Sequence, residues 1–153
     1  MNILYPKRAE YRKKITKITK CEFCNRKNIN QQECKTLSGK SWMVLVNKYP
    51  YMDGNLMIVP KRHLRDIEEL NKDERNEFYQ VFKSAKVKLS KIFKTEDFNL
   101  GINFGKKAGS SIEHMHWQII PRKEKILNSS NIFADLYVIT ISPEKLRKLI
   151  DKK

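Results

Sequence analysis

Residues 114–122 read HMHWQIIPR, which is an H-x-H-x-Q pattern followed by an apolar pair and Pro-Arg. Two of the three histidines of this 153-residue chain lie here, two residues apart. The remaining side chains are mostly apolar or β-branched, which predicts a strand. Successive side chains of a strand point to opposite faces, so one face should be polar and the other apolar. The polar face would carry His114, His116 and Gln118, and the apolar face Met115, Trp117 and Ile119.

A pair of imidazoles on one face is costly to bury without partners. It suits a site that needs an imidazole nucleophile or a metal ligand. The alternative is a half-exposed sheet face that carries two histidines without any special function.

The residues just upstream favour a site for an anion. Residues 98–105 alternate as a strand does and end in Gly, and residues 106–113 form a Gly/Ser turn with two lysines. Turns of this composition expose backbone N–H groups and hydroxyls. Strand, small-residue loop and histidine strand together predict a phosphate cradle. The alternative is an ordinary hairpin with a long, solvated loop.

The rest of the chain predicts one α+β domain with an antiparallel sheet. Residues 1–20 are expected to be a basic arm with a short helix, and residues 21–153 to be the domain. Within the domain, residues 21–40 are polar and loop-like. Two antiparallel strands are expected at 41–47 and 55–60, joined through Tyr49-Pro50 and Asp53-Gly54.

Helical spacing of apolar residues predicts one long helix. It would open at Asn71 or Asp73 and run to about Phe93. A last strand is expected near 136–141. Ser142 followed by Pro143 then indicates the start of a C-terminal helix.

Composition limits the function classes only weakly. The formal charge of +15, from 32 Lys and Arg against 17 Asp and Glu, favours anionic partners such as nucleotides or nucleic acid. The lysines are spread over the whole chain, however, as a lysine-rich proteome would also produce. No apolar run approaches 18 residues, so neither a membrane span nor a secretory signal is expected. The odd number of cysteines, three, fits a reducing cytoplasm rather than a disulfide framework.

A C-x-x-C pattern at Cys21 and Cys24 is the second chemical feature. Two thiolates can hold one tetrahedral Zn²⁺ when two more ligands are available, and the candidates are Cys34, His63 and His114. A redox C-x-x-C would normally open a helix after a strand, and the basic arm does not resemble that strand. Chance spacing is the remaining alternative.

Two segments resemble the histidine-triad (HIT) superfamily of nucleotide hydrolases and transferases. One is residues 98–122, and the other is residues 45–63, whose strand, turn and strand end in Pro-Lys-Arg-His. The resemblance covers about residues 20–150. Gln118 stands where the usual motif has a third histidine, which resembles the branch of diadenosine tetraphosphate phosphorylases and galactose-1-phosphate uridylyltransferase. Asn55 also stands where many hydrolase members carry a histidine.

The resemblance implies a HIT-like fold and a homodimer. The fold would have a five-stranded antiparallel sheet, one long helix and a C-terminal helix. The uridylyltransferase ligand set implies one structural zinc ion. Carried over, its ligands fall on Cys21, Cys24, His63 and His114, which are soft and borderline donors suited to Zn²⁺. Cys34 would be a spare buried or surface thiol.

The resemblance also implies roles for residues of the predicted cradle. His116 would be the nucleophile, and Gln118 would donate its amide N–H to a phosphate oxygen. The expected contacts to the α-phosphate and leaving group are Asn103, Gly109 and Ser111, with Ser110 beside them and Asn47 at the ribose. Asn47 could instead only cap a turn, and Ser110 or Ser111 could only shape the loop.

Three functions are therefore open. The first is a nucleotidylyl-transferring phosphorylase or hydrolase that acts on dinucleoside polyphosphates. The second is a hydrolase of nucleoside phosphoramidates or adenylyl conjugates, with the same chemistry and another leaving group. The third is a basic nucleic-acid-binding module with structural zinc and no activity.

Overall fold

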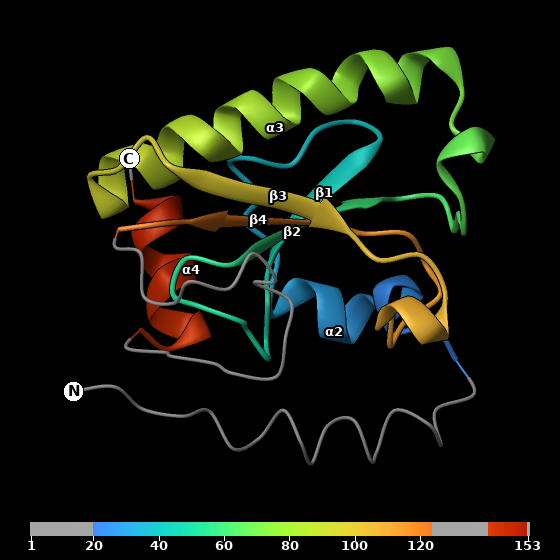
Figure 1. Cartoon of the computed structure of the whole chain (residues 1–153), viewed down its shortest axis with the longest axis horizontal. Coiled ribbons are helices and arrows are strands. Elements are labelled where there is room, and N and C mark those ends of the chain that lie inside the picture. The colour runs from blue at the N-terminus through green and yellow to red at the C-terminus, as the bar shows by residue number, and fades with distance from the viewer. Residues whose placement is uncertain (1–19, 124–140, 153) are drawn as a thin grey trace.

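The computed structural model describes residues 20–123 and 141–152 (Figure 1). Within these ranges the strands form one antiparallel sheet in the order β1-β2-β4-β3. Their bounds are β1 Trp42–Val46, β2 Leu56–Pro60, β3 Phe98–Ile102 and β4 Trp117–Pro121. The predicted α+β class with an antiparallel sheet is confirmed, with four strands among the described residues rather than five. The strand expected near 136–141 falls almost entirely outside those residues, as does the basic arm.

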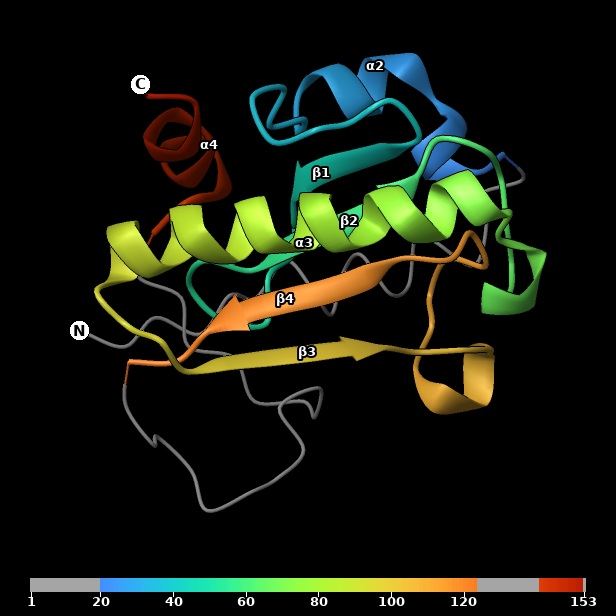
Figure 2. The ribbon, with the colours of Figure 1, turned by 90° about the horizontal axis from the view of Figure 1, so that it is seen from above.

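The long helix α3, Lys72–Phe93, crosses one face of the sheet (Figure 2). It begins at Asn71, whose side chain accepts the Glu74 N–H while the Glu74 side chain accepts the Asn71 N–H. This reciprocal capping box satisfies N–H groups that the first helical turn leaves without partners. The helix ends at Lys94, which adopts a left-handed conformation with φ of 52°. The helix predicted to run from Asn71 or Asp73 to Phe93 is confirmed, with Asn71 as its cap.

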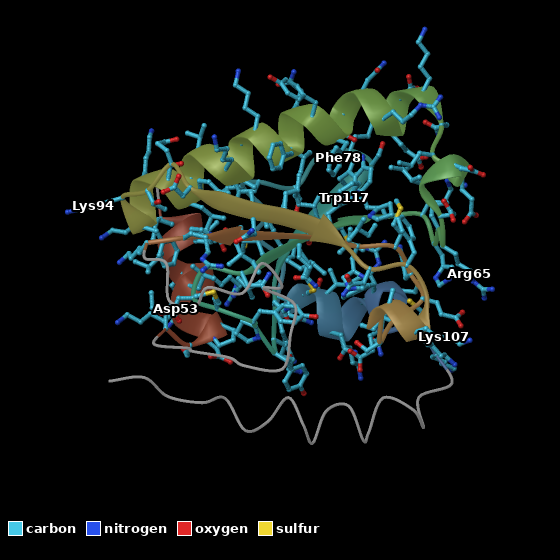
Figure 3. All side chains as sticks on the ribbon, in the orientation of Figure 1. Asp53, Arg65, Phe78, Lys94, Lys107 and Trp117 are labelled. Carbon is cyan, nitrogen blue, oxygen red and sulfur yellow. The ribbon has the colours of Figure 1, made fainter. Side chains whose placement is uncertain are left out.

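The contact between α3 and the sheet forms the main hydrophobic core. Its central ring is Phe78, whose centroid lies 5.0 Å from that of Trp42 and 5.2 Å from that of Trp117 (Figure 3). Buried helix residues then follow at every fourth position: Val81, Ala85, Leu89 and Phe93. Each large apolar side chain buried in this way contributes about 1.5–3 kcal/mol. This layer fixes the position of β4, and therefore of the residues that precede it.

The opposite face of the sheet is covered by the segment that we expected to be a loop. Residues 21–40 contain a short 3₁₀ helix, η1 (Glu22–Cys24), and a helical turn, α2 (Arg26–Asn30). These short helices could not be recognised from the polar sequence, because only Phe23 and Ile29 are buried against the sheet. These two residues form a second apolar cluster with Met43, Leu45, Met57 and Val59. Strands β1 and β2 are consequently buried on both faces.

The C-terminal helix α4, Pro143–Asp151, begins where the sequence predicted. Ser142 caps it through the Lys145 N–H, and Pro143 occupies the first turn. Leu146 and Ile150 enter the core beneath α3. Two further 3₁₀ turns are η2 (Ile67–Glu69) and η3 (Lys106–Ala108). In the described part of the chain, no helix has the length and apolarity that crossing a membrane requires.

Candidate functional site

An open pocket with about 560 Å³ of free space lies on the sheet face that η1 covers. It is bounded by η1, the turn from β1 to β2, and the loop from β3 to β4. All residues predicted to be catalytic or to contact a nucleotide line it: Asn47, Asn103, Gly109, Ser110, Ser111, His116 and Gln118.

The two histidines precede β4 rather than lying on it, which corrects the predicted strand at 114–120. Trp117 is the first residue of β4 and pairs with both Ile58 of β2 and Ile102 of β3. β3 ends at Ile102, and the Met115 N–H donates to Leu64 O, so the residues before Trp117 form no ladder pair within the sheet. Alternation nevertheless continues through it: Met115, Trp117 and Ile119 face the main core, whereas His116 and Gln118 face the pocket.

The orientation of His116 is set by a main-chain acceptor. Its Nδ1 lies 2.9 Å from the carbonyl oxygen of His114. Because a carbonyl oxygen can only accept, Nδ1 must carry the proton, and Nε2 keeps the lone pair of the neutral ring. The Phe23 ring meets the His116 ring edge-on, with centroids 5.1 Å apart. His116 is therefore held with a nucleophilic nitrogen in the correct tautomer.

Gln118 is buried beside His116, with 6% of its surface exposed. Its Oε1 accepts a hydrogen bond of 2.8 Å from Asn55 Nδ2, and Asn47 Nδ2 lies 3.4 Å from the same oxygen. The sequence did not assign a role to Asn55 beyond its departure from the family pattern. Its contact with Gln118 depends on the register of β2 against β4, in which Met57 pairs with Gln118.

Several N–H groups of the loop between β3 and β4 form hydrogen bonds within the loop itself. The N–H groups of Ala108 and Ser110 donate to Gly105 O, and that of Gly109 donates to Lys106 O. These groups stabilise η3 and are not presented to an anion, which differs from the expected cradle of exposed N–H groups. A short 3₁₀ turn satisfies its own donors in this way.

The predicted polar contacts of this loop separate into two kinds. Ser110 Oγ donates to Ile112 O at 2.7 Å, so this hydroxyl shapes the loop. Ser111 is exposed and lines the pocket. Asn103 follows β3, and its Nδ2 would lie 3.6 Å from a Cβ at Gly109, so these two residues are adjacent. The pocket therefore has an amide and a hydroxyl on its loop side.

A second cluster brings together all of the residues predicted as metal ligands. The ligand atoms of Cys21, Cys24, His63 and His114 lie within 4.8 Å of one another. His114 Nδ1 is 3.4 Å from Cys21 Sγ and 3.7 Å from Cys24 Sγ, and His63 Nδ1 is 3.4 Å from Cys24 Sγ. A tetrahedral zinc ion with ordinary Zn–S and Zn–N bonds would separate sulfur from nitrogen by about 3.6 Å. The four residues could thus hold a metal ion.

The surroundings of His114 favour its role as a neutral ligand. Its Nε2 lies 2.9 Å from Pro60 O, so this nitrogen carries the proton and Nδ1 faces the thiols. Burial, with the nearby His63, lowers the pKa of His114 to about 4. Burial also raises the pKa of Cys21 to about 11, helped by its hydrogen bond with Cys24. A metal ion would reverse that effect, because a coordinated thiol is deprotonated.

His63 is held by the loop that follows β2. Its neighbour Arg62 makes two hydrogen bonds to the Glu74 carboxylate, at 3.0 and 2.9 Å, and one to Glu69 O at 2.8 Å. The Arg62 guanidinium holds the pKa of the buried Glu74 below its usual range. This ion pair fixes the loop to the start of α3. The third cysteine, Cys34, lies in the main core, where burial raises its pKa to about 12.

Several pocket residues were missed by the sequence interpretation. Phe23 lies between the two cysteines and lines the pocket, together with Gln32, Tyr49 and Met57. The available signal for Phe23 was an aromatic residue within a polar segment. No comparable signal marks Gln32, which reaches the pocket only because its main-chain oxygen accepts the N–H of Val46.

Comparison with known proteins identifies the class to which this fold and site belong. The family model described as "HIT domain" matches residues 28–125, more than half of the chain. The chain therefore belongs to the HIT domain family. The resemblance seen in the sequence is confirmed.

The chain is similar to an AP-4-A phosphorylase from Mycobacterium tuberculosis, with 35% identity over 110 residues, which are 71% of this chain and 55% of the relative. It is also similar to a bis(5'-adenosyl)-triphosphatase from Dictyostelium discoideum, with 31% identity over 93 residues, 60% of this chain and 62% of the relative. The chain thus spans between half and two thirds of these relatives. Among solved structures, a hypothetical histidine triad nucleotide-binding protein from Sulfolobus tokodaii matches with a TM-score of 0.66 and 26% identity, covering 86% of this chain and 89% of that one.

Proposed function

We propose that this protein is a nucleotidylyl-transferring enzyme that acts at the α-phosphate of dinucleoside polyphosphates. The observation that carries the proposal is the hydrogen bond from His116 Nδ1 to His114 O, at 2.9 Å, at the wall of the pocket. It places the proton of the neutral imidazole on Nδ1 and the lone pair on Nε2, the nitrogen that would attack phosphorus. The family and the names of two relatives, a phosphorylase and a triphosphatase, support the same chemistry.

The reaction would proceed in two displacements. His116 Nε2 attacks the α-phosphorus, the bond from that phosphorus to its bridging oxygen breaks, and the nucleoside polyphosphate leaves with the bonding electrons. An oxygen of inorganic phosphate or water then attacks the same phosphorus. The bond to Nε2 breaks, and the imidazole returns to its neutral form. With diadenosine tetraphosphate, the first step releases ATP, and the second gives ADP with phosphate or AMP with water.

The remaining pocket residues would bind and stabilise the substrate. Gln118 and Ser111 would donate hydrogen bonds to phosphate oxygens as charge develops on them. The side chain of Asn103 would meet the α-phosphate beside Gly109, and Asn47 would contact the ribose. Ser110 would act by holding the loop, because its hydroxyl bonds to Ile112 O.

We also propose that the Cys/His cluster holds one Zn²⁺. Two thiols and two imidazoles are the donor set of structural zinc sites, and their separations fit a tetrahedron. The ion would stabilise the fold rather than take part in the reaction, because protein ligands would fill all four of its coordination positions. It would fasten the η1 segment to the histidine segment and so support one wall of the pocket.

Cleavage of dinucleoside polyphosphates is favoured over cleavage of phosphoramidates by the presence of an amide at position 118. A neutral amide can position phosphate oxygens but cannot protonate an amine leaving group. The substrate should therefore have a leaving group that departs unprotonated, such as a nucleoside polyphosphate.

The product assay separates these possibilities. Diadenosine tetraphosphate is incubated with the protein, with and without inorganic phosphate, and nucleotides are resolved by chromatography. We expect ATP and ADP when phosphate is present, and ADP only then. AMP and ATP in equal amounts in both tubes would show hydrolysis and contradict phosphorolysis. Absence of turnover in both tubes and with adenosine phosphoramidate would favour a non-catalytic binding module.

A further inference from the structure

Three side-chain amides lie in a row beneath the pocket. Asn47, Asn55 and Gln118 have exposed fractions of 7%, 0% and 6%. Asn47 Nδ2 donates to Asn55 Oδ1 at 2.9 Å, and Asn55 Nδ2 donates to Gln118 Oε1 at 2.8 Å. The three come from the end of β1, the start of β2 and the middle of β4. The sheet register therefore assembles a continuous row of amides that ends next to His116.

The directions of the two asparagine amides are determined by main-chain groups. The Tyr49 N–H donates to Asn47 Oδ1 at 2.9 Å, and the Tyr51 N–H donates to Asn55 Oδ1 at 3.2 Å. Asn55 Nδ2 donates in turn to Leu56 O at 3.1 Å. A backbone N–H can only donate and a carbonyl can only accept, so neither asparagine can be turned over without losing these bonds.

Asn55 uses its complete hydrogen-bonding capacity in this arrangement. Its oxygen accepts from Asn47 Nδ2 and the Tyr51 N–H, and its nitrogen donates to Leu56 O and Gln118 Oε1. A buried polar group with every partner in place is rigid, and breaking one bond leaves an unsatisfied group. Asn55 is therefore a fixed donor aimed at Gln118.

We infer that Asn55 is a positioning residue that keeps the Gln118 amide turned with its NH₂ group toward the substrate. Because Gln118 Oε1 is engaged by Asn55, the opposite end of the amide, Nε2, is the end available to the pocket. A reversed Gln118 would place its carbonyl oxygen against the phosphate oxygens and repel them. This inference rests on the proposed function, since it assigns the phosphate as the group that Gln118 meets.

The substitution Asn55→Asp removes the donor that faces Gln118 without changing the shape of the side chain. A carboxylate cannot donate, so Gln118 would turn its NH₂ toward residue 55 and its oxygen toward the substrate. Loss of one such donor in other enzymes lowers kcat by about 10²–10³-fold. We expect a loss of about 100-fold in kcat with KM changed by less than about threefold. The matched control is Asn99→Asp, outside the pocket, where the carboxylate can still accept from Arg122, and it should keep full activity.

A double-mutant cycle distinguishes positioning from a general effect on folding. If Asn55 acts through Gln118, Asn55→Asp should cost less than about threefold when Gln118 has already been replaced by Ala. An equal 100-fold loss in both backgrounds would overturn the inference. Thermal unfolding of each variant shows whether the compared proteins are folded.

An NMR measurement on the unmodified protein tests the same orientation without turnover or mutation. With AMP as the probe, the Gln118 side-chain NH₂ signals should shift, and the Asn55 NH₂ protons should be protected from exchange with solvent. Protected Gln118 protons that do not respond to bound AMP would show the reverse orientation and overturn the inference. If diadenosine tetraphosphate is not turned over, the proposed function fails, and these spectra still decide how Gln118 is turned.

Discussion

At the scale of single residues, the site depends on which nitrogen of one imidazole carries the proton. His116 has one nitrogen bonded to a carbonyl oxygen, so the other can attack without first losing a proton. Gln118 next to it has an amide that can donate hydrogen bonds to oxygens but cannot protonate a leaving group. In the proposed mechanism, attack and stabilisation are therefore divided between these two side chains.

Replacing His116 by Ala should abolish turnover of diadenosine tetraphosphate. The variant lacks the nucleophile, so kcat should fall by on the order of 10³-fold or more. Folding and AMP binding should change little, because His116 is only partly buried and its side-chain hydrogen bond to a carbonyl lies at the pocket wall. Rapid-quench kinetics and titration with AMP measure the two effects. A variant that keeps a tenth of the wild-type rate would contradict the assignment of the nucleophile.

At the scale of elements, the turn from β1 to β2 places Asn47 and Asn55 beside each other. Gly54 makes this possible with a φ of +81°, a region that strongly favours glycine. A Cβ at this position would lie 2.7 Å from Phe93 Cε2 and closer still to Pro121. The turn is thus locked against the end of α3 and the end of β4.

Gly54→Ala should destabilise the protein by about 2–4 kcal/mol, because the cost of a left-handed alanine is joined by overpacking. Gly109→Ala is the control. Gly109 is left-handed, with φ of 91° and ψ of 7°, and the nearest atom to a Cβ there would be Asn103 Nδ2 at 3.6 Å, an ordinary contact distance. The control should therefore lose only about 1–2 kcal/mol. Urea unfolding measures both, and equal losses would show that packing at Gly54 contributes nothing.

At the scale of the whole molecule, the sheet is held between α3 and the η1–α2 segment (Figure 1). The α3 layer forms an extensive apolar core with the sheet, whereas the η1–α2 segment has few large apolar residues of its own. The Cys/His cluster lies at the end of this segment, and Phe23 belongs to both the segment and the pocket wall. The proposed metal site and the proposed nucleotide pocket therefore share this thin segment.

The purified protein should contain one zinc ion per chain, and removing it should weaken both the fold and the pocket. Structural zinc contributes on the order of 10 kcal/mol in small zinc domains, so a chelator should lower the unfolding temperature markedly. Affinity for AMP should fall as well, since Phe23 loses its anchor. Metal analysis of Cys21→Ser should show lost zinc, whereas Cys34→Ala, in the main core, should retain it. Full zinc retention in Cys21→Ser would contradict the ligand set.

The sequence predicted the parts of the molecule that carry local signals. The helical spacing of apolar residues marked α3, with Asn71 or Asp73 as its expected start, and alternation marked the strands. The α2 turn was missed because a five-residue helix with one buried side chain has no detectable period. Asn55 and Gln32 were missed because their functions depend on neighbours that only the tertiary fold supplies. The histidine segment was assigned to a strand because alternation continues past the last paired residue, Trp117.

Residue 114 serves the site twice, once through its ring and once through its main chain. The ring lies among the thiols, and the carbonyl oxygen accepts a hydrogen bond from His116 Nδ1. An amino-acid substitution can remove only the first of these two contacts. Any substitution at this position deletes the imidazole, yet every amino acid brings the same carbonyl. A mutational scan would consequently record only the proposed metal-binding role of this residue, and the main-chain acceptor that orients the proposed nucleophile would leave no trace in such data.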